Sequence, residues 1–81
     1  STQWVIDSGA TDHMTGNPKL FSTFHKHLSS VTLADGSTSN VLGSGTINIT
    51  PTLPLTSVLS LPQFSFNLVS VSKITRALNC G

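Results

Sequence analysis

Charged side chains are scarce in this chain of 81 residues. Only 9% of the residues are charged, and four Lys or Arg stand against three Asp and no Glu, so the formal net charge is +1. We therefore expect no nucleic acid and no membrane as partner, because binding to either normally requires a basic surface. The scarcity of charge also favours strands and turns over exposed helices.

Cysteine occurs once, as Cys80. One thiol excludes an internal disulfide and cannot form a zinc site alone, so we expect Cys80 to be a small apolar packing residue. No apolar run approaches the length of a membrane span, and we expect no signal peptide at the start of the chain. We expect one small domain over residues 1–81, cut from a longer chain, because a strand begins almost at Ser1.

The residues that are present indicate a mostly β domain. Residues 3–6 are predicted to form a fully buried strand, residues 31–49 a hairpin that turns at Asp35-Gly36, and residues 55–61 another strand. Glycine inside the returning strand of the hairpin, at Gly43 and Gly45, indicates close approach by another backbone.

Two further segments carry apolar residues at helical spacing. Residues 20–28 are predicted to be an irregular segment that places Phe21 and Phe24 in the core. Asn67 is predicted to cap a C-terminal helix that ends at Gly81. The apolar positions of this helix are Leu68, Val71, Ile74 and Leu78.

The stretch WVIDSGATDH places Asp7 directly after three apolar residues. In a structural interpretation, the Asp7 side chain opens a turn by accepting from a backbone N–H two residues later. In a chemical interpretation, Asp7 is half of a paired-carboxylate site, because a carboxylate at the end of a buried strand is costly unless it is needed. Two such carboxylates share one proton, and one then acts as a base on water.

The other acids do not supply the second carboxylate. Asp12 and Asp35 both lie in turn-like contexts, and neither ends an apolar strand. A paired site would therefore need a second copy of the chain, related by a twofold axis near Asp7, so we expect a homodimer. Asp35 is expected to form a turn. Asp12 either ends a turn or touches substrate at the edge of a cleft.

The segment WVIDSGATDHMTG resembles the active-site segment of the aspartic proteases of copia-type LTR retrotransposons, which typically read W-x-x-D-S-G-A-[ST]-x-H-[ML]. Further similarities follow in the family's order over nearly the whole chain: VTLADGS, VLGSGTI, LTSVLSLP, NLVSVSKI and LNC. The resemblance implies half of a retropepsin-like acid-protease β-barrel, closed on dimerisation, with a flap hairpin and one short C-terminal helix. It implies an aspartic endopeptidase that needs no cofactor or metal and processes a Gag-Pol polyprotein in cytoplasmic virus-like particles.

The resemblance also assigns residues. Asp7 would be the catalytic acid, and Ser8, Gly9 and Ala10 would form the active-site loop. A peptide bound in extended form would touch Thr11, Asp12 and the flap tip, which comprises Ala34, Asp35, Gly36 and Ser37.

This chain departs from the retroviral members of the family. In those proteins an Arg precedes the Asn at the start of the last helix and pairs with an acid two places after the catalytic Gly. Phe66 and Thr11 stand at these places here, with Asn67 matched to the start of the helix. The ion pair is therefore absent, and we expect the dimer to be fixed differently.

Two other functions stay open. One is a catalytically silent or domesticated module of the same fold that binds peptides or protein partners. The other is a metal-binding module through His25 and His27, which the lack of a nearby acid or thiol disfavours. His13 is expected to pack or hydrogen-bond beside the active-site loop, and core or subsite-wall positions are expected for Met14, Phe64 and Phe66.

Overall fold

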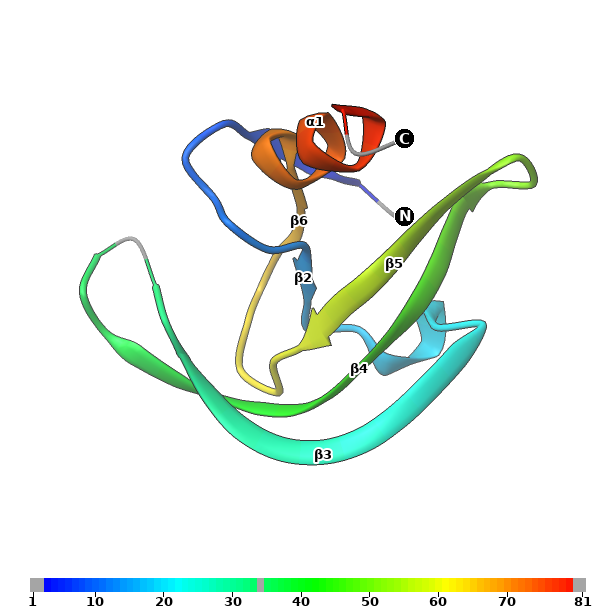
Figure 1. The fold of residues 1–81 in the computed structure, drawn as a ribbon. Helices are drawn as coiled ribbons and strands as arrows, with labels where there is room; N and C mark the ends of the chain where they lie inside the picture. Colours follow the sequence, from blue (N-terminus) through cyan, green and yellow to red (C-terminus); the bar gives the residue numbers. More distant parts are fainter. Residues whose placement is uncertain (1–2, 34, 80–81) are drawn as a thin grey trace.

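The computed structural model describes residues 3–33 and 35–79, so the predictions made for Ala34, Cys80 and Gly81 lie outside the described residues. The elements in chain order are β1 (Val5–Asp7), β2 (Met14–Thr15), the 3-10 helix η1 (Pro18–Leu20), β3 (Thr23–Thr32), β4 (Thr38–Thr50), β5 (Leu53–Ser60), β6 (Asn67–Ser70) and α1 (Val71–Asn79). The predicted mostly β domain with one short C-terminal helix is confirmed (Figure 1).

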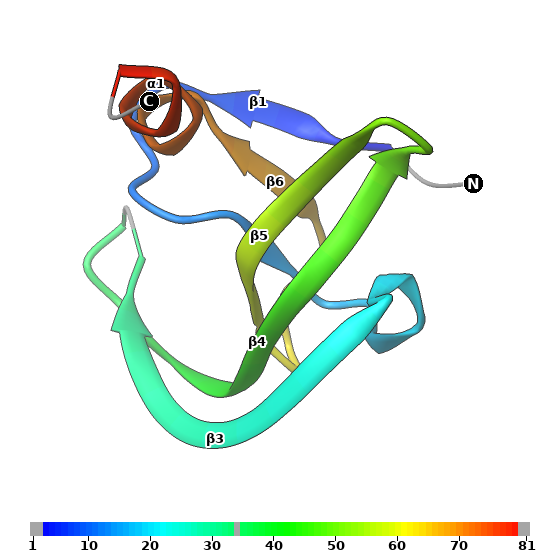
Figure 2. The same ribbon diagram turned by 45° about the vertical axis from the view of Figure 1, so that its right-hand side comes forward.

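The strands form one six-stranded sheet in the order β1-β6-β2-β5-β4-β3. β6 pairs in parallel with β1 and antiparallel with β2, while β2 pairs in parallel with β5. β3, β4 and β5 form an antiparallel meander, and its long strands curve strongly (Figure 2). Among the described residues β1 and β3 remain as edges, so the sheet of one chain is not closed into a barrel.

The core consists of two clusters of buried side chains. The first contains Ile47, Leu55, Val58 and Val69, with Trp4, Leu20, Phe21, Ile49 and Ile74 packed against it. The second contains Met14, Val41 and Leu61, with Val31, Leu33, Leu59, Phe64 and Leu68 packed against it. Met14 begins β2 at the end of the segment that follows β1, so the second cluster connects the core with the region of Asp7.

The hairpin predicted around Asp35-Gly36 is confirmed and is longer than predicted. β3 and β4 pair from Thr23↔Thr46 to Thr32↔Thr38. Asp35 forms the turn, because its Oδ1 accepts from the backbone N–H of Ser37 at 2.9 Å and from the hydroxyl at 2.6 Å. Gly36 has φ +89°, a conformation that glycine adopts without strain.

The prediction of a fully buried strand over residues 3–6 is wrong. The strand is β1, and Val5 and Ile6 are 48% and 74% exposed. Its apolar run has the composition of a central strand, yet β1 is an edge that pairs only with β6 among the described strands. In the part of the chain that the structure describes, the side chains of Val5 and Ile6 and the second edge of β1 are therefore left open.

The prediction of an irregular segment over residues 20–28 that places two Phe rings in the core is wrong for the conformation and for Phe24, but Phe21 does pack against the first core cluster. Most of this segment belongs to β3, and Phe24 is 42% exposed while its ring packs on that of half-buried Phe21. The β3 backbone lies so close to β4 that a Cβ at Gly43 or Gly45 would collide with a β3 carbonyl oxygen. The close approach predicted from these glycines is therefore confirmed, and it keeps the segment extended.

The C-terminal helix starts later than predicted. Asn67 does not cap it but begins β6, and the helix begins at Val71. Ser70 is the cap, since its Oγ accepts from the N–H of Lys73 at 3.0 Å. Asn67 instead accepts from Thr15 Oγ1 at 2.5 Å and donates to the carbonyl of Gln3 at 2.9 Å. The predicted strand over residues 55–61 is confirmed as β5, which starts at Leu53.

Candidate functional site

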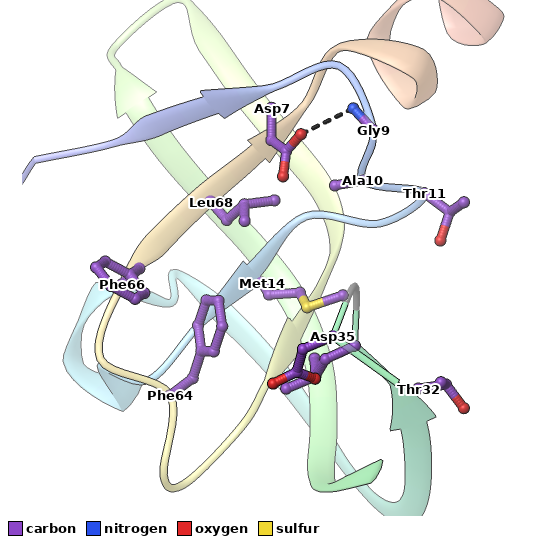
Figure 3. Close-up of a pocket in the computed structure, with 11 residues that line it drawn as sticks. Asp7, Gly9, Ala10, Thr11, Met14, Thr32, Asp35, Phe64, Phe66 and Leu68 are labelled. Carbon is purple, nitrogen blue, oxygen red and sulfur yellow. Dashed lines mark hydrogen bonds between the residues drawn. The ribbon is translucent and has the colours of Figure 1, made fainter. Parts of the chain in front are cut away.

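A pocket of about 440 Å³ opens beside the end of β1 (Figure 3). Its walls come from the loop after β1, from β2, from the tip of the β3–β4 hairpin and from the segment that enters β6. The lining residues are Asp7, Gly9, Ala10, Thr11, Met14, Thr32, Leu33, Asp35, Phe64, Phe66 and Leu68. Most of these side chains are apolar, and the two carboxylates, Asp7 and Asp35, lie on opposite sides of the pocket.

The pocket brings together five of the residues predicted for the site: Asp7, Gly9, Ala10, Thr11 and Asp35. Ser8, Asp12, Gly36 and Ser37 do not line it, and Ala34 lies outside the described residues. The hydroxyl of Thr11 donates to Asp12 Oδ2 at 3.3 Å, which fits the interpretation that Asp12 ends the turn.

Three lining residues were not predicted as site residues: Thr32, Leu33 and Leu68. Thr32 and Leu33 are close in sequence to the predicted turn at Asp35-Gly36, and this proximity is the feature of the sequence that could have identified them as lining residues. Leu68 was assigned to a helix, and no sequence signal placed it in a pocket wall. Phe64 and Phe66 do form a wall, with ring centroids 5.7 Å apart in an edge-to-face contact.

The Asp7 carboxylate is half-buried and combines both interpretations made from the sequence. Its Oδ1 accepts from the backbone N–H of Gly9 at 2.8 Å, which is the turn contact. Its carboxylate also lines the pocket, which is the placement that the chemical interpretation requires. Within the described residues this contact with Gly9 is its one hydrogen bond.

The loop after Asp7 is held from its far side by β6 and α1. The carbonyl of Ala10 accepts from Ser70 Oγ at 2.6 Å, and the carbonyl of Thr11 accepts from the Arg76 guanidinium at 3.3 Å. The sequence predicts that no ion pair forms at Thr11. The structure has a different contact there, in which Arg76 donates to the backbone oxygen of Thr11. Phe66 packs on Phe64 and is 58% exposed.

His13 lies behind this loop and is buried, with 3% of its surface exposed. Its Nδ1 accepts from the backbone N–H of Ser70 at 2.9 Å, so the predicted hydrogen bonding beside the loop is confirmed. Burial lowers the pKa of His13 below its ordinary value of 6.5, the charge of Lys73 lowers it further, and Asp12 raises it. The buried ring is therefore held in its neutral form.

Residues 3–33 and 35–79 contain neither a metal-ligand cluster nor a membrane-spanning helix. No group of three or more His, Cys, Asp or Glu side chains occurs there that could hold a metal ion. Among the same residues no helix is long and apolar enough to cross a membrane. His25 and His27 lie on the exposed strand β3.

Comparison with known proteins matches residues 4–78 to the family described as "Pol polyprotein, beta-barrel domain". The chain is 35% identical over 72 residues to the putative transposon Ty5-1 protein YCL075W of Saccharomyces cerevisiae, a match that covers 88% of this chain and 49% of that protein. It is 36% identical over 81 residues to the retrovirus-related Pol polyprotein from transposon RE2 of Arabidopsis thaliana, covering 91% of this chain and 5% of that protein.

The corresponding polyprotein from transposon RE1 of Arabidopsis thaliana is 33% identical over 82 residues, with coverage of 95% of this chain and 6% of the polyprotein. The chain thus spans half or less of each of these relatives. No solved structure matches it significantly.

Proposed function

The chain belongs to the Pol polyprotein β-barrel domain family, and from this we propose that it is one protomer of a homodimeric aspartic endopeptidase that cleaves a retrotransposon Gag-Pol polyprotein. The observation that carries the proposal is the half-buried Asp7 carboxylate, which lines a pocket of about 440 Å³. Asp12 does not line this pocket and Asp35 is engaged in its own turn. A second carboxylate therefore has to come from a second copy of the chain.

The proposed reaction uses one Asp7 from each protomer. Two carboxylates in contact share one proton, because both cannot ionise cheaply side by side. The ionised carboxylate takes a proton from a water whose oxygen attacks the peptide carbonyl carbon, while the protonated one donates to the carbonyl oxygen. The C–N bond of the tetrahedral diol then breaks as the amine nitrogen takes a proton, which yields an acid and an amine.

The shape and chemistry of the pocket support a peptide as the substrate. Apolar side chains from Met14, Leu33, Phe64, Phe66 and Leu68 suit apolar side chains of a peptide. The hairpin tip faces Asp7 across the pocket, which suits a flap that closes over an extended chain (Figure 3).

The surroundings of the reaction are part of the same proposal. The printed names of the relatives are those of a transposon protein and of Pol polyproteins, which favours a polyprotein segment as the substrate. We place the reaction in cytoplasmic virus-like particles, with no cofactor, metal, nucleic acid or membrane used by this domain. The net charge of +1 gives no indication of a basic partner-binding surface.

The test compares Asp7→Asn with Asp12→Asn on peptides taken from the flanking polyprotein. The amide introduced by Asp7→Asn keeps an oxygen for the Gly9 N–H, so we expect the circular dichroism spectrum to stay unchanged. Cleavage should fall by at least about 10³-fold, because the amide can neither share nor transfer the proton. Asp12→Asn removes the same charge outside the pocket and should retain cleavage. Normal turnover by Asp7→Asn would refute the mechanism.

A second candidate is a silent module of the same fold that binds peptides without cutting them. The pocket favours it in one respect, because the apolar side chains that line it all come from a single chain. The two functions differ in the role of Asp7. A silent module would bind the peptides with equal affinity before and after Asp7→Asn, and the unsubstituted chain would leave them intact.

A further inference from the structure

Ser70 binds three groups from a fully buried position. Its Oγ donates to the carbonyl of Ala10 at 2.6 Å, in the loop that carries Asp7. The same Oγ accepts from the N–H of Lys73 at 3.0 Å, and the backbone N–H of Ser70 donates to His13 Nδ1 at 2.9 Å. The start of α1, the loop after β1 and the ring of His13 therefore meet at one residue.

The contact with His13 depends on the protonation state of the ring. An imidazole nitrogen accepts a hydrogen bond only when it carries no proton, so the neutral ring holds its proton on Nε2. The imidazolium has a proton on both nitrogens and cannot accept from Ser70. Protonation of His13 would place the Nδ1–H of the ring against the N–H of Ser70. Both groups are donors, so the buried N–H of Ser70 would lose its hydrogen-bond partner.

We propose that His13 is a positioning residue for the catalytic loop. In its neutral form it holds Ser70, and Ser70 Oγ holds the carbonyl of Ala10. In its protonated form it releases Ser70, and the loop that carries Asp7 loses this support. The consequence for catalysis rests on the function proposed above, whereas the coupling of His13 to Ala10 does not.

The charged groups around His13 are few and come from two segments. Asp12 precedes it in the chain, and Lys73 faces it from α1. Lys73 Nζ donates to the carbonyls of Thr56 and Ser57 at 3.1 and 2.8 Å, so the ammonium stays between β5 and α1. Arg76, also on α1, donates to the carbonyl of Thr11. β5 contributes the backbone N–H of Leu59, which binds the His13 carbonyl at 2.9 Å.

Burial and the Lys73 charge disfavour the imidazolium, and Asp12 partly offsets them. The His13 contact therefore persists somewhat below pH 6.5, the ordinary pKa of histidine, and is released in more acidic solution. Paired carboxylates, by contrast, need enough acid to keep one shared proton. His13 would thus set the acidic limit of activity.

Nuclear magnetic resonance of the whole chain tests the coupling without any assay of cleavage. The His13 ring nitrogens and the carbonyl carbon of Ala10 are followed as the pH is lowered, with the amide of exposed Thr52 as the reference. We expect the Ala10 carbonyl to shift with the midpoint of the His13 ring, while Thr52 stays constant. A constant Ala10 signal during His13 titration would overturn the proposal, and so would a simultaneous shift of all three signals, which would indicate unfolding.

Substitutions test the Ser70–Ala10 contact and the His13–Ser70 contact separately. In Ser70→Ala the His13 ring should still titrate, but the Ala10 carbonyl should no longer follow it, since the bridging hydroxyl is gone. Ser70→Thr, which keeps a hydroxyl, should restore the coupling. If Ser70→Ala does not fold, His13→Gln decides, because its Ala10 carbonyl must show no titration. His25→Gln on β3 is the control and must leave the coupling intact.

Kinetics then connect the contact with catalysis. In the unsubstituted chain kcat should fall with the His13 midpoint while KM stays constant. Ser70→Ala should lower kcat by about 10²-fold, as expected for a slightly misplaced catalytic group. If the chain cleaves nothing, the proposed protease function fails, while the resonance experiment still decides on the role of His13. If it cleaves and kcat does not follow His13, the positioning role fails alone.

Discussion

Asp7 and Ser70 are partners in the parallel pairing of β1 with β6. The residue that caps α1 is therefore the strand partner of the residue whose carboxylate lines the pocket, and its hydroxyl also holds the loop after Asp7. Ser70 itself does not line the pocket. A change in β6 can therefore alter the position of Asp7 without touching a ligand.

Association of two copies is the first prediction. Sedimentation of the chain over micromolar concentrations should show a monomer–dimer equilibrium. Pepstatin, an inhibitor of aspartic proteases, should shift it towards the dimer, because a ligand that binds only the dimer stabilises it. A monomer that is indifferent to the inhibitor at every concentration would contradict the shared site.

Thr15 connects β2 with β6 and should contribute strongly to stability. It is fully buried, and its Oγ1 donates to Asn67 at 2.5 Å and accepts from the N–H of Asn17 at 3.1 Å. Thr15→Val keeps the shape but leaves both groups without a partner, so the free energy of unfolding should fall by about 1–3 kcal/mol. Urea denaturation measures this.

The matched control for Thr15 is Thr56→Val, on an exposed position of β5. The free energy of unfolding should change there by less than about 0.5 kcal/mol. Equal effects at the two positions would show that the Thr15 hydroxyl contributes nothing specific.

Acid should destabilise the fold through His13. The unfolded chain takes up this proton near pH 6.5, and the folded chain takes it up only at lower pH, since burial lowers the pKa. Between the two values the unfolded state binds more protons, so the free energy of unfolding falls as the pH is lowered from 6.5 towards the folded pKa. Urea denaturation across this range, with and without His13→Gln, measures the slope.

The variant should flatten that slope, and His25→Gln should leave it unchanged. Asp35 affects the free energy of unfolding in a separate and more acidic pH range, because hydrogen bonds from the Ser37 hydroxyl and backbone lower its pKa below 3.8. Its contribution to stability is present above 3.8 and is lost as the pH falls through the folded pKa. A slope near pH 6.5 that survives His13→Gln would contradict the assignment.

Glycine at position 45 is required by the approach of β3 to β4. A Cβ there would collide with the carbonyl oxygen of Thr23. Gly45→Ala should therefore lower the free energy of unfolding by about 1–3 kcal/mol, as overpacking does. Thermal or urea denaturation measures the loss.

Gly36→Ala is the comparison for Gly45, since Gly36 has open space around it but a φ of +89°. Its cost should be limited to the backbone conformation, about 1 kcal/mol. A larger loss at Gly36 than at Gly45 would contradict the close approach of the two strands.

Local patterns predicted the parts of the fold that depend on neighbouring residues. The Asp35-Gly36 turn is confirmed because its hydrogen bonds and its positive φ lie within the turn itself. The glycines of β4 indicated close approach because the lack of a side chain is visible in the sequence. The turn contact of Asp7 with Gly9 was likewise predictable from two nearby positions.

The errors arose where the partner lies far away in the chain. Residues 67–70 carry apolar positions that suit a strand as well as a helix, and pairing with β1 and β2 makes them β6. β1 has the apolar composition of a buried strand but lies at an edge. Phe24 was expected in the core, and the pairing of β3 with β4 leaves it exposed.

The chemistry available at the site is encoded locally, because the stretch WVIDSGATDH supplies one carboxylate after an apolar strand and a glycine that allows the turn. Which residues join Asp7 in a pocket, and which contacts hold its loop, depends on the tertiary structure. Leu68 lines the pocket beside Asp7, and Ser70 forms hydrogen bonds with Ala10 and His13, so segments from opposite ends of the chain meet at the site. Contacts of this kind depend on how strands pair across the whole sheet, and no local pattern encodes that pairing.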